Sequence, residues 1–158
     1  MQELSGGRFH ALRIGMGWHP DEYEAMGVPF EGRGRRGDET LRLVRALSNG
    51  EHDFDRPLCS FRDMTADPQP KPIPGIWVGG SSERAIRRAR ELGDEWHPSR
   101  GSEVDHVRSV TERFPDLRIV PRTRPERVDG MLDAEAEGAV VTFADEAAMR
   151  DFARRYLG

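Results

Sequence analysis

An α/β fold built from about five parallel βα units is what this sequence predicts. Short β-rich runs alternate with segments of helical length, and the apolar residues of those segments recur at helical spacing. Strands that alternate with helices of this length form βαβ units, in which the strands are parallel. The chain has 158 residues, enough for one domain of ordinary size, so a single domain over 1–158 is expected.

The first half of the chain is the less regular one. A buried strand is expected to end in Gly-Met-Gly, and a later helix has leucine and valine on one face. An irregular excursion rich in Asp, Pro and aromatic residues follows, with a hairpin as one form. The elements expected here are a strand at 9–17, a helix at 21–25, a helix introduced by 37–38 and closed by 49–50, and the excursion at 51–74.

Strands and helices alternate tightly in the second half. Ser102-x-x-Asp105 resembles a capping box at a helix start. The last helix has a clear apolar face that includes Phe152 and Leu157. The expected strands are 76–79, 94–97, 117–121 and 139–144, and the expected helices are 82–92, 102–114, 126–137 and 146–157.

Composition excludes several classes of function. The net charge is −4 and no basic tract is long enough for a nucleic-acid groove, so no nucleic-acid partner is expected. Lys71 is the single lysine, and the arginines are scattered over predicted helix faces, where a few could bind phosphate or carboxylate. No apolar run approaches bilayer length and residues 1–8 lack a signal-peptide pattern, so no membrane contact and a cytoplasmic location are expected. The single cysteine, Cys59, excludes an internal disulfide.

One pair of residues invites a metal interpretation. His19 and Glu22 lie three positions apart, but a helix that begins near Asp21 explains Glu22 as a first-turn residue that compensates the helix dipole. The histidines at positions 10, 52 and 106 show no ligand spacing, and no CxxC occurs. We therefore expect no metal.

The most informative segment is 78–82, Val-Gly-Gly-Ser-Ser, between an apolar strand and an amphipathic helix. A strand that ends in two glycines and opens directly onto a helix leaves backbone N–H groups free at the positive end of that helix. Such a turn suits an anion such as a cofactor phosphate. A tight βα turn that binds nothing is the alternative.

Several segments, taken with this turn, resemble one known family. They match the middle of the luciferase-like monooxygenase family in order, and most closely its branch that uses the deazaflavin coenzyme F420. The resemblance covers residues 4–98, beyond which only the βα rhythm persists. The segments are LSGGRF (4–9), GMGW (15–18), EYEAMGVPF (22–30), RGRRGDE (33–39) and a block that runs from PGIWVGGS (74–81) to GDEW (93–96).

The family fold is a (β/α)₈ barrel, and the resemblance places residues 9–17 at its fourth strand. The chain is therefore expected to be a partial TIM barrel that matches strands 4–8. A closed barrel has no free edges, whereas an arc of strands exposes two. The resemblance thus implies a homo-oligomer, or a partner chain that covers the exposed strand edges.

The resemblance also implies a cofactor site at the carboxyl ends of the strands. One segment would line the ring of coenzyme F420, or of FMN as the alternative, and a second segment corresponds to the phosphate-binding turn. His97 is the candidate general acid, with an ordinary surface histidine as the alternative, and the catalytic set is otherwise unknown. The cofactor-binding residues so implied are Met16, Gly17 and Trp18 in the first segment and Gly79, Gly80, Ser81 and Ser82 in the second.

The implied activity is hydride transfer to or from a small organic substrate, by a luciferase-like F420- or flavin-dependent oxidoreductase whose barrel a partner could complete. One alternative is a catalytically inactive barrel fragment that keeps the phosphate turn. Another is that the sequence is part of a longer enzyme whose coding sequence begins upstream.

Overall fold

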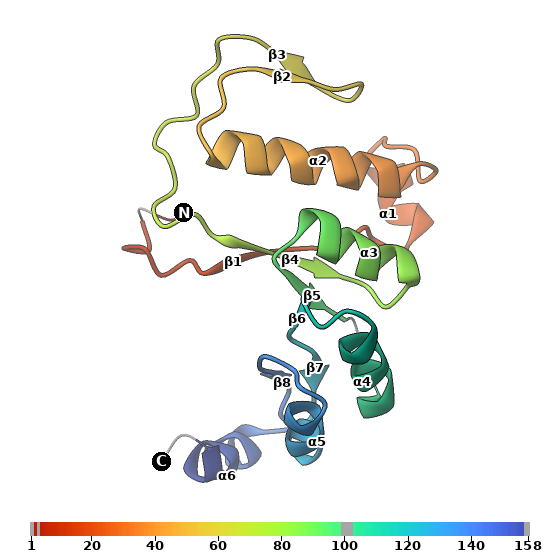
Figure 1. The fold of residues 1–158 in the computed structure, drawn as a ribbon, viewed down its shortest axis with the longest axis vertical. Helices are drawn as coiled ribbons and strands as arrows, with labels where there is room; N and C mark the ends of the chain where they lie inside the picture. Colours follow the sequence, from red (N-terminus) through yellow and green to blue (C-terminus); the bar gives the residue numbers. More distant parts are fainter. Residues whose placement is uncertain (1, 3, 99–102, 157–158) are drawn as a thin grey trace.

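A curved row of parallel strands organises the protein. The computed structural model describes residues 2, 4–98 and 103–156 (Figure 1). The predicted α/β class with a parallel sheet is confirmed, because the main sheet has four parallel strands in the order β1-β4-β5-β6. These strands are β1 (Ala11–Ile14), β4 (Gly75–Gly79), β5 (Glu95–His97) and β6 (Arg118–Ile119).

A proline separates the last strands from this sheet. The predicted strand 117–121 ends at Ile119 because Pro121 has no N–H to donate to a ladder. The chain resumes as β7 (Arg122–Thr123), which pairs in parallel with β8 (Val140–Val141). The Val140 N–H also donates to the Pro121 carbonyl, with an N···O distance of 2.9 Å. The β8 strand therefore lies in fifth place in the row, as five βα units require.

Helices follow the strands along the chain, and α3 (Glu83–Leu92), α4 (Val104–Arg113) and α5 (Val128–Asp133) lie on one side of the row (Figure 1). The excursion at 51–74 contains a short antiparallel hairpin, in which the rings of Phe54 and Phe61 stack with centroids 5.7 Å apart. In Figure 1 the hairpin lies on the side of α2 away from the sheet. The remaining elements are α1 (Pro20–Ala25), α2 (Arg33–Ser48), β2 (Phe54–Asp55), β3 (Ser60–Phe61), η1 (Pro125–Arg127) and α6 (Glu146–Tyr156).

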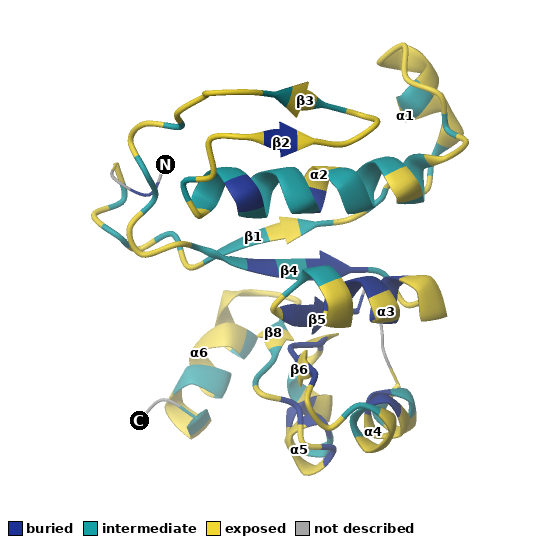
Figure 2. Ribbon diagram, turned by 45° about the horizontal axis from the view of Figure 1, so that its top comes forward, coloured by how far each residue is buried: buried dark blue, intermediate teal, exposed yellow. Residues whose placement is uncertain are grey.

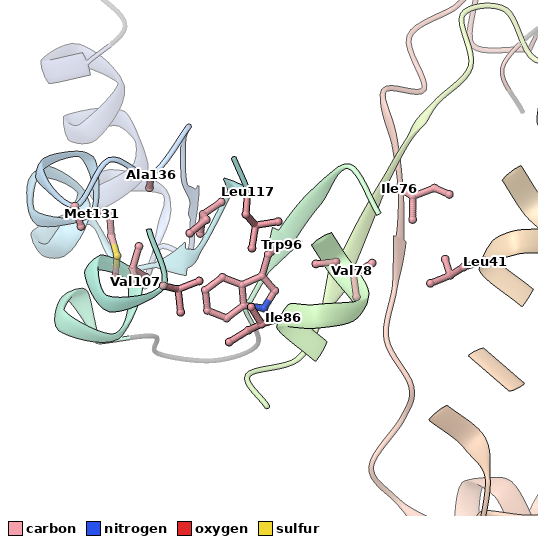
Figure 3. Packing of buried hydrophobic residues seen from close by; sticks show 13 residues of the cluster. Leu41, Ile76, Val78, Ile86, Trp96, Val107, Leu117, Met131 and Ala136 are labelled. Atoms are coloured by element: carbon pink, nitrogen blue, oxygen red, sulfur yellow. The ribbon is translucent and has the colours of Figure 1, made fainter. Parts of the chain in front are cut away.

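Strand register gives the sheet two different faces. Alternate residues of a strand point to opposite faces, so residues in register share a face. The apolar row packs against helix residues such as Leu41, Ile86 and Val107 to form the core, with Trp96 between the strands and helices (Figure 3). The apolar row is Ile14, Val78, Trp96 and Ile119, and the polar row on the other face is Arg13, Trp77, Glu95 and Arg118.

The second helix begins earlier than its sequence predicts. The pair Gly37-Asp38 placed the expected start at 37–38, but α2 begins at Arg33, with Gly32 as its N-cap in the left-handed region. Tertiary contacts explain the difference. The Arg88 guanidinium donates to the Gly34 carbonyl at 3.3 Å, and a Cβ at Gly37 would lie 2.0 Å from the Met16 sulfur. The glycines thus allow close approach inside the helix and do not end it.

The C-terminal part is packed more loosely. The predicted helix 126–137 is reduced to η1 and α5, and α6 has no buried residue among those described (Figure 2). The α6 helix is held to α5 by Asp129, which accepts hydrogen bonds from Tyr156 at 2.6 Å and Arg155 at 2.8 Å. Leu157 of the predicted apolar face and Ser102 of the predicted capping box lie outside the described residues, and Glu103 is the N-cap of α4.

Every helix in the described ranges is too short or too polar to cross a membrane.

Candidate cofactor cleft

A cleft of about 750 Å³ opens where β1 and β4 end and where α2 and α3 begin. Parallel strands bring these loops to one edge of the sheet, which is where ligands of such folds bind. Ser81 lies within the same turn but is not among the lining residues, whereas the other predicted cofactor residues line the cleft. Those residues are Met16, Gly17, Trp18, Gly79, Gly80 and Ser82.

The turn after β4 has no room for side chains. A Cβ at Gly79 would lie 3.3 Å from the Ile14 carbonyl oxygen, so the backbone of β1 would have to shift by a few tenths of an ångström. Gly80 has a φ of +112°, which residues with side chains rarely adopt, and a Cβ there would lie 3.0 Å from the Cβ of Ala85. Two successive positions therefore favour glycine, and the backbone itself borders the cleft.

Hydrogen bonds hold this turn in one orientation. The indole N–H of Trp96 donates to the Gly80 carbonyl at 2.7 Å, from a side chain that is fully buried. Ser82 is the N-cap of α3, and its hydroxyl accepts from the Ala85 N–H at 3.2 Å. The N–H groups of Glu83 and Arg84 begin the helix and have no acceptor within it. This end of α3 therefore carries a partial positive charge beside the cleft.

The loop after β1 forms the opposite wall. Gly17 has a φ of +66°, and the ring of Tyr23 packs where its Cβ would lie. The Tyr23 hydroxyl donates to the Met16 carbonyl, and the Arg33 side chain donates to the Gly17 carbonyl at 3.3 Å. Trp18 is 74 % exposed, so it stands at the rim of the cleft and not in the core.

The sequence indicates that a few arginines could bind phosphate, but it does not show which of them converge in this cleft. The lining has five arginines and no carboxylate, so the cleft is strongly cationic in a chain of net negative charge. Arg88 is mostly buried and paired with Asp38 of α2, which fixes its position. The available signal was the spacing of Arg84 and Arg88, one helical turn apart directly after the glycine turn. The five are Arg13, Arg33, Arg35, Arg84 and Arg88.

His97 lies elsewhere than expected. It is 1 % exposed and does not line the cleft, so it is neither a residue of the cofactor cleft nor a surface histidine. Its ring stacks on Trp77 with centroids 5.6 Å apart, and neither ring nitrogen has a hydrogen-bond partner among the described residues. The cause is register, since His97 follows Glu95 on the polar face of the sheet and the short β5 strand is buried. Its role as an acid stays a prediction.

Burial lowers the pKa of His97 below its ordinary value of about 6.5, and the positive charge of Arg13 lowers it further. As the pH falls below 6.5, His97 becomes protonated in the unfolded chain while it is still neutral in the folded chain. We therefore expect the stability to be highest above pH 6.5 and to decrease as the pH falls through the pKa of the folded state. Urea unfolding at pH 7.5 and 5.5 should show this decrease in the wild type and a smaller one in His97→Phe.

Burial raises the pKa of Glu95 on the same face, which acts in the opposite direction but equally in both proteins. Parallel pH profiles for the wild type and the His97→Phe variant would show that His97 is not the source of the decrease.

Two polar residues near the ends of β7 and β8, and the His19 region, lie apart from the centre of the cleft. Arg122 donates to the Thr142 hydroxyl at 3.1 Å, and neither residue lines the cleft. His19 lies 3.8 Å from Asp21, measured from Nδ1 to the carboxylate. Within the described part of the chain, no three His, Cys, Asp or Glu side chains are grouped so that they could hold a metal ion.

Fold and cleft together define an α/β protein of the barrel type with a cationic cleft at the carboxyl ends of its strands. The chain belongs to the luciferase-like monooxygenase family, whose model matches residues 1–157. Its row of five parallel strands is thus part of that family's barrel.

Curated relatives include uncharacterised proteins of Mycobacterium tuberculosis and Mycobacterium bovis, which are 37 % identical to this chain over 113 residues. The aligned residues make up 67 % of this chain and 38 % of each relative. The FMNH2-dependent dimethylsulfone monooxygenase of Pseudomonas putida is 30 % identical over 118 residues, covering 71 % of this chain and 32 % of that protein. The chain therefore spans about a third of the length of the curated relatives it matches.

Solved structures show the same fold. An F420-dependent secondary alcohol dehydrogenase, in complex with an F420–acetone adduct, aligns with a TM-score of 0.64 at 11 % identity. The alignment covers 99 % of this chain and 62 % of that one. The EDTA monooxygenase of Chelativorans sp. BNC1 aligns with a TM-score of 0.52 at 16 % identity, covering 98 % and 42 % of the two chains.

Proposed function

We propose that this chain binds coenzyme F420 or FMN in the cleft between β1 and β4, as part of an oxidoreductase that acts on a small organic molecule. The observation that carries the proposal is the turn at Gly79 and Gly80, where a backbone without side chains meets the start of α3. The names of the relatives add support, since one uses F420 and another FMNH2.

The residues present suit an anionic cofactor. A phosphate needs close approach of the backbone, which the two glycines allow, and it gains from the positive end of a helix. Arg84 lines the cleft in the first turn of α3, where a planar guanidinium can bind phosphate oxygens in pairs. We assign the phosphate to Gly79, Gly80, Ser81 and Ser82.

The β1 loop would hold the ring. Met16, Gly17 and Trp18 border the cleft opposite the turn, and an exposed tryptophan at the rim can cover an aromatic ring and exclude water from it. A bound flavin or deazaflavin supplies hydride chemistry, while the protein positions it. The chain's own residues therefore bind and orient the cofactor. His97 stays the predicted proton donor, although it does not line the cleft.

Titration of the purified protein with FMN and with coenzyme F420, followed by fluorescence, tests the proposal. We expect saturable binding of at least one of them with a stoichiometry of one per chain. Absence of saturable binding by both would refute it. Binding without turnover of any alcohol or sulfone would favour the alternative of an inactive barrel fragment that keeps the turn.

The proposal includes a cytoplasmic location and a partner for the free strand edges. Among the described strands, β1 pairs only with β4, which leaves one of its edges unpaired in the sheet. Cys59 is a free thiol, as a reducing compartment allows. A second copy or another chain that adds strands at β1 would cover the edge. Light scattering of the purified protein tests for the second copy, and a strictly monomeric mass would exclude it.

A further inference from the structure

We propose that a second anion-binding groove, between α2 and α3, continues the cofactor cleft and selects a cofactor whose negative charges extend beyond its first phosphate. This inference rests on the proposed function, because it concerns the far end of the same cofactor. It distinguishes coenzyme F420, which bears further carboxylates beyond its phosphate, from FMN, which ends at its phosphate.

The groove has a volume of about 350 Å³ and shares part of its wall with the cleft. The shared residues are Gly34, Arg35, Arg84 and Arg88, so an extended ligand could pass from one to the other along these residues. Beyond them the groove alone contains Arg42 of α2 and Arg87 of α3. The two helices contact each other, and in Figure 1 α3 lies below α2, in front of the strands.

The arginines of both helices are spaced so that they share the helix face that lines the groove. Arg84, Arg87 and Arg88 lie three and four positions apart, which places them on one face of α3. Arg35 and Arg42 lie two turns apart on the facing side of α2. The groove therefore collects positive charge from two helices along its length.

Most of this charge is not neutralised within the protein. The side chains of Arg35, Arg42 and Arg84 form no hydrogen bond or ion pair in the described ranges, although many other arginines of this chain do. Of the two carboxylates in the groove, Asp38 is occupied by Arg88, and Glu91 alone remains.

Glu83, an acid close enough to Arg87 to be affected by its charge, is occupied as well. The pKa of the exposed Glu83 carboxyl is lowered first by its hydrogen bonds from Arg113, at 2.8 and 2.9 Å. Arg87 contributes to that shift without forming an ion pair in the described residues. Its guanidinium is therefore available to another anion.

Carboxylates or phosphates on a chain fit this arrangement. Arginine binds either group with two parallel hydrogen bonds, and rows of arginines along a groove suit successive charges on one ligand. The groove is open to solvent, so its contribution to affinity should be screened by salt.

Binding of FMN and coenzyme F420 to the full chain and to Arg42→Gln/Arg87→Gln tests the inference. Both residues line the groove but not the cleft. We expect the double substitution to weaken F420 binding about tenfold and FMN binding less than about twofold. In 0.5 M salt the difference between the two proteins should largely disappear. Arg124→Gln, at an exposed arginine outside both cavities, is the matched control and should change neither affinity.

Each other outcome has a definite meaning. Unchanged F420 affinity, equal weakening of both cofactors, or binding of FMN alone would overturn the groove and leave the proposed function standing. Failure of both cofactors to bind the wild type would overturn the proposed function and this inference with it. Circular dichroism of the variants shows whether a loss of affinity comes from a loss of fold.

Discussion

Replacement of Gly80 by valine should weaken cofactor binding by about 10- to 100-fold. The substituted residue would have to keep a φ of +112° and a Cβ 3.0 Å from Ala85, so the turn must rearrange. A left-handed conformation costs a residue with a side chain about 1–2 kcal/mol. Loss of one backbone hydrogen bond to a charged phosphate costs about 1.5–3 kcal/mol, which corresponds to the stated range. Fluorescence titration with the cofactor that binds the wild type measures the change.

Gly138→Val is the matched control for Gly80→Val. No atom lies within 4 Å of the place that a Cβ at Gly138 would occupy, and Gly138 has no positive φ. The change should therefore leave the cofactor affinity and the unfolding midpoint nearly as they are. If Gly80→Val bound the cofactor as the wild type does, the turn would not be the phosphate site.

Trp96→Ala should destabilise the protein by about 3–5 kcal/mol, since its side chain is fully buried at the centre of the core. Figure 3 shows its indole between Ile86 and the residues of α4. The total stability of a small domain is only about 5–15 kcal/mol, so this loss is a large fraction of it. Urea unfolding measures the difference, with Trp18→Ala as the control. Trp18 is 74 % exposed, and its removal should cost less than about 0.5 kcal/mol.

Trp96→Phe separates the packing of this residue from its effect on the site. Phenylalanine keeps most of the apolar surface but cannot donate to the Gly80 carbonyl. We expect the variant to fold with a stability loss of about 1–2 kcal/mol and to bind the cofactor several-fold more weakly. Unchanged cofactor affinity in this folded variant would show that the Trp96 hydrogen bond does not position the turn.

The local sequence pattern was enough to predict those elements whose structure depends on neighbouring residues in the sequence. Apolar residues at helical spacing predict α3 and α4 to within two residues of their observed ends, because burial of one face defines such helices. The Gly-Gly-Ser-Ser turn was visible for the same reason, since strand, turn and N-cap are consecutive. Gly37 misled the prediction of the start of α2, because this glycine allows close contact with Met16, which lies in another part of the sequence.

The parallel α/β class, the family and the glycine turn could be predicted from local sequence, because each depends on a short run of residues and its propensities. The folded structure was needed to show that Arg13, Arg35 and Arg84 come together in one cleft, and that His97 is buried against Trp77. The position of these side chains depends on the register of β1 against β4 and on the packing of α2 against α3. Both join residues that lie far apart in the sequence, such as Ala11 with Gly75 and Asp38 with Arg88.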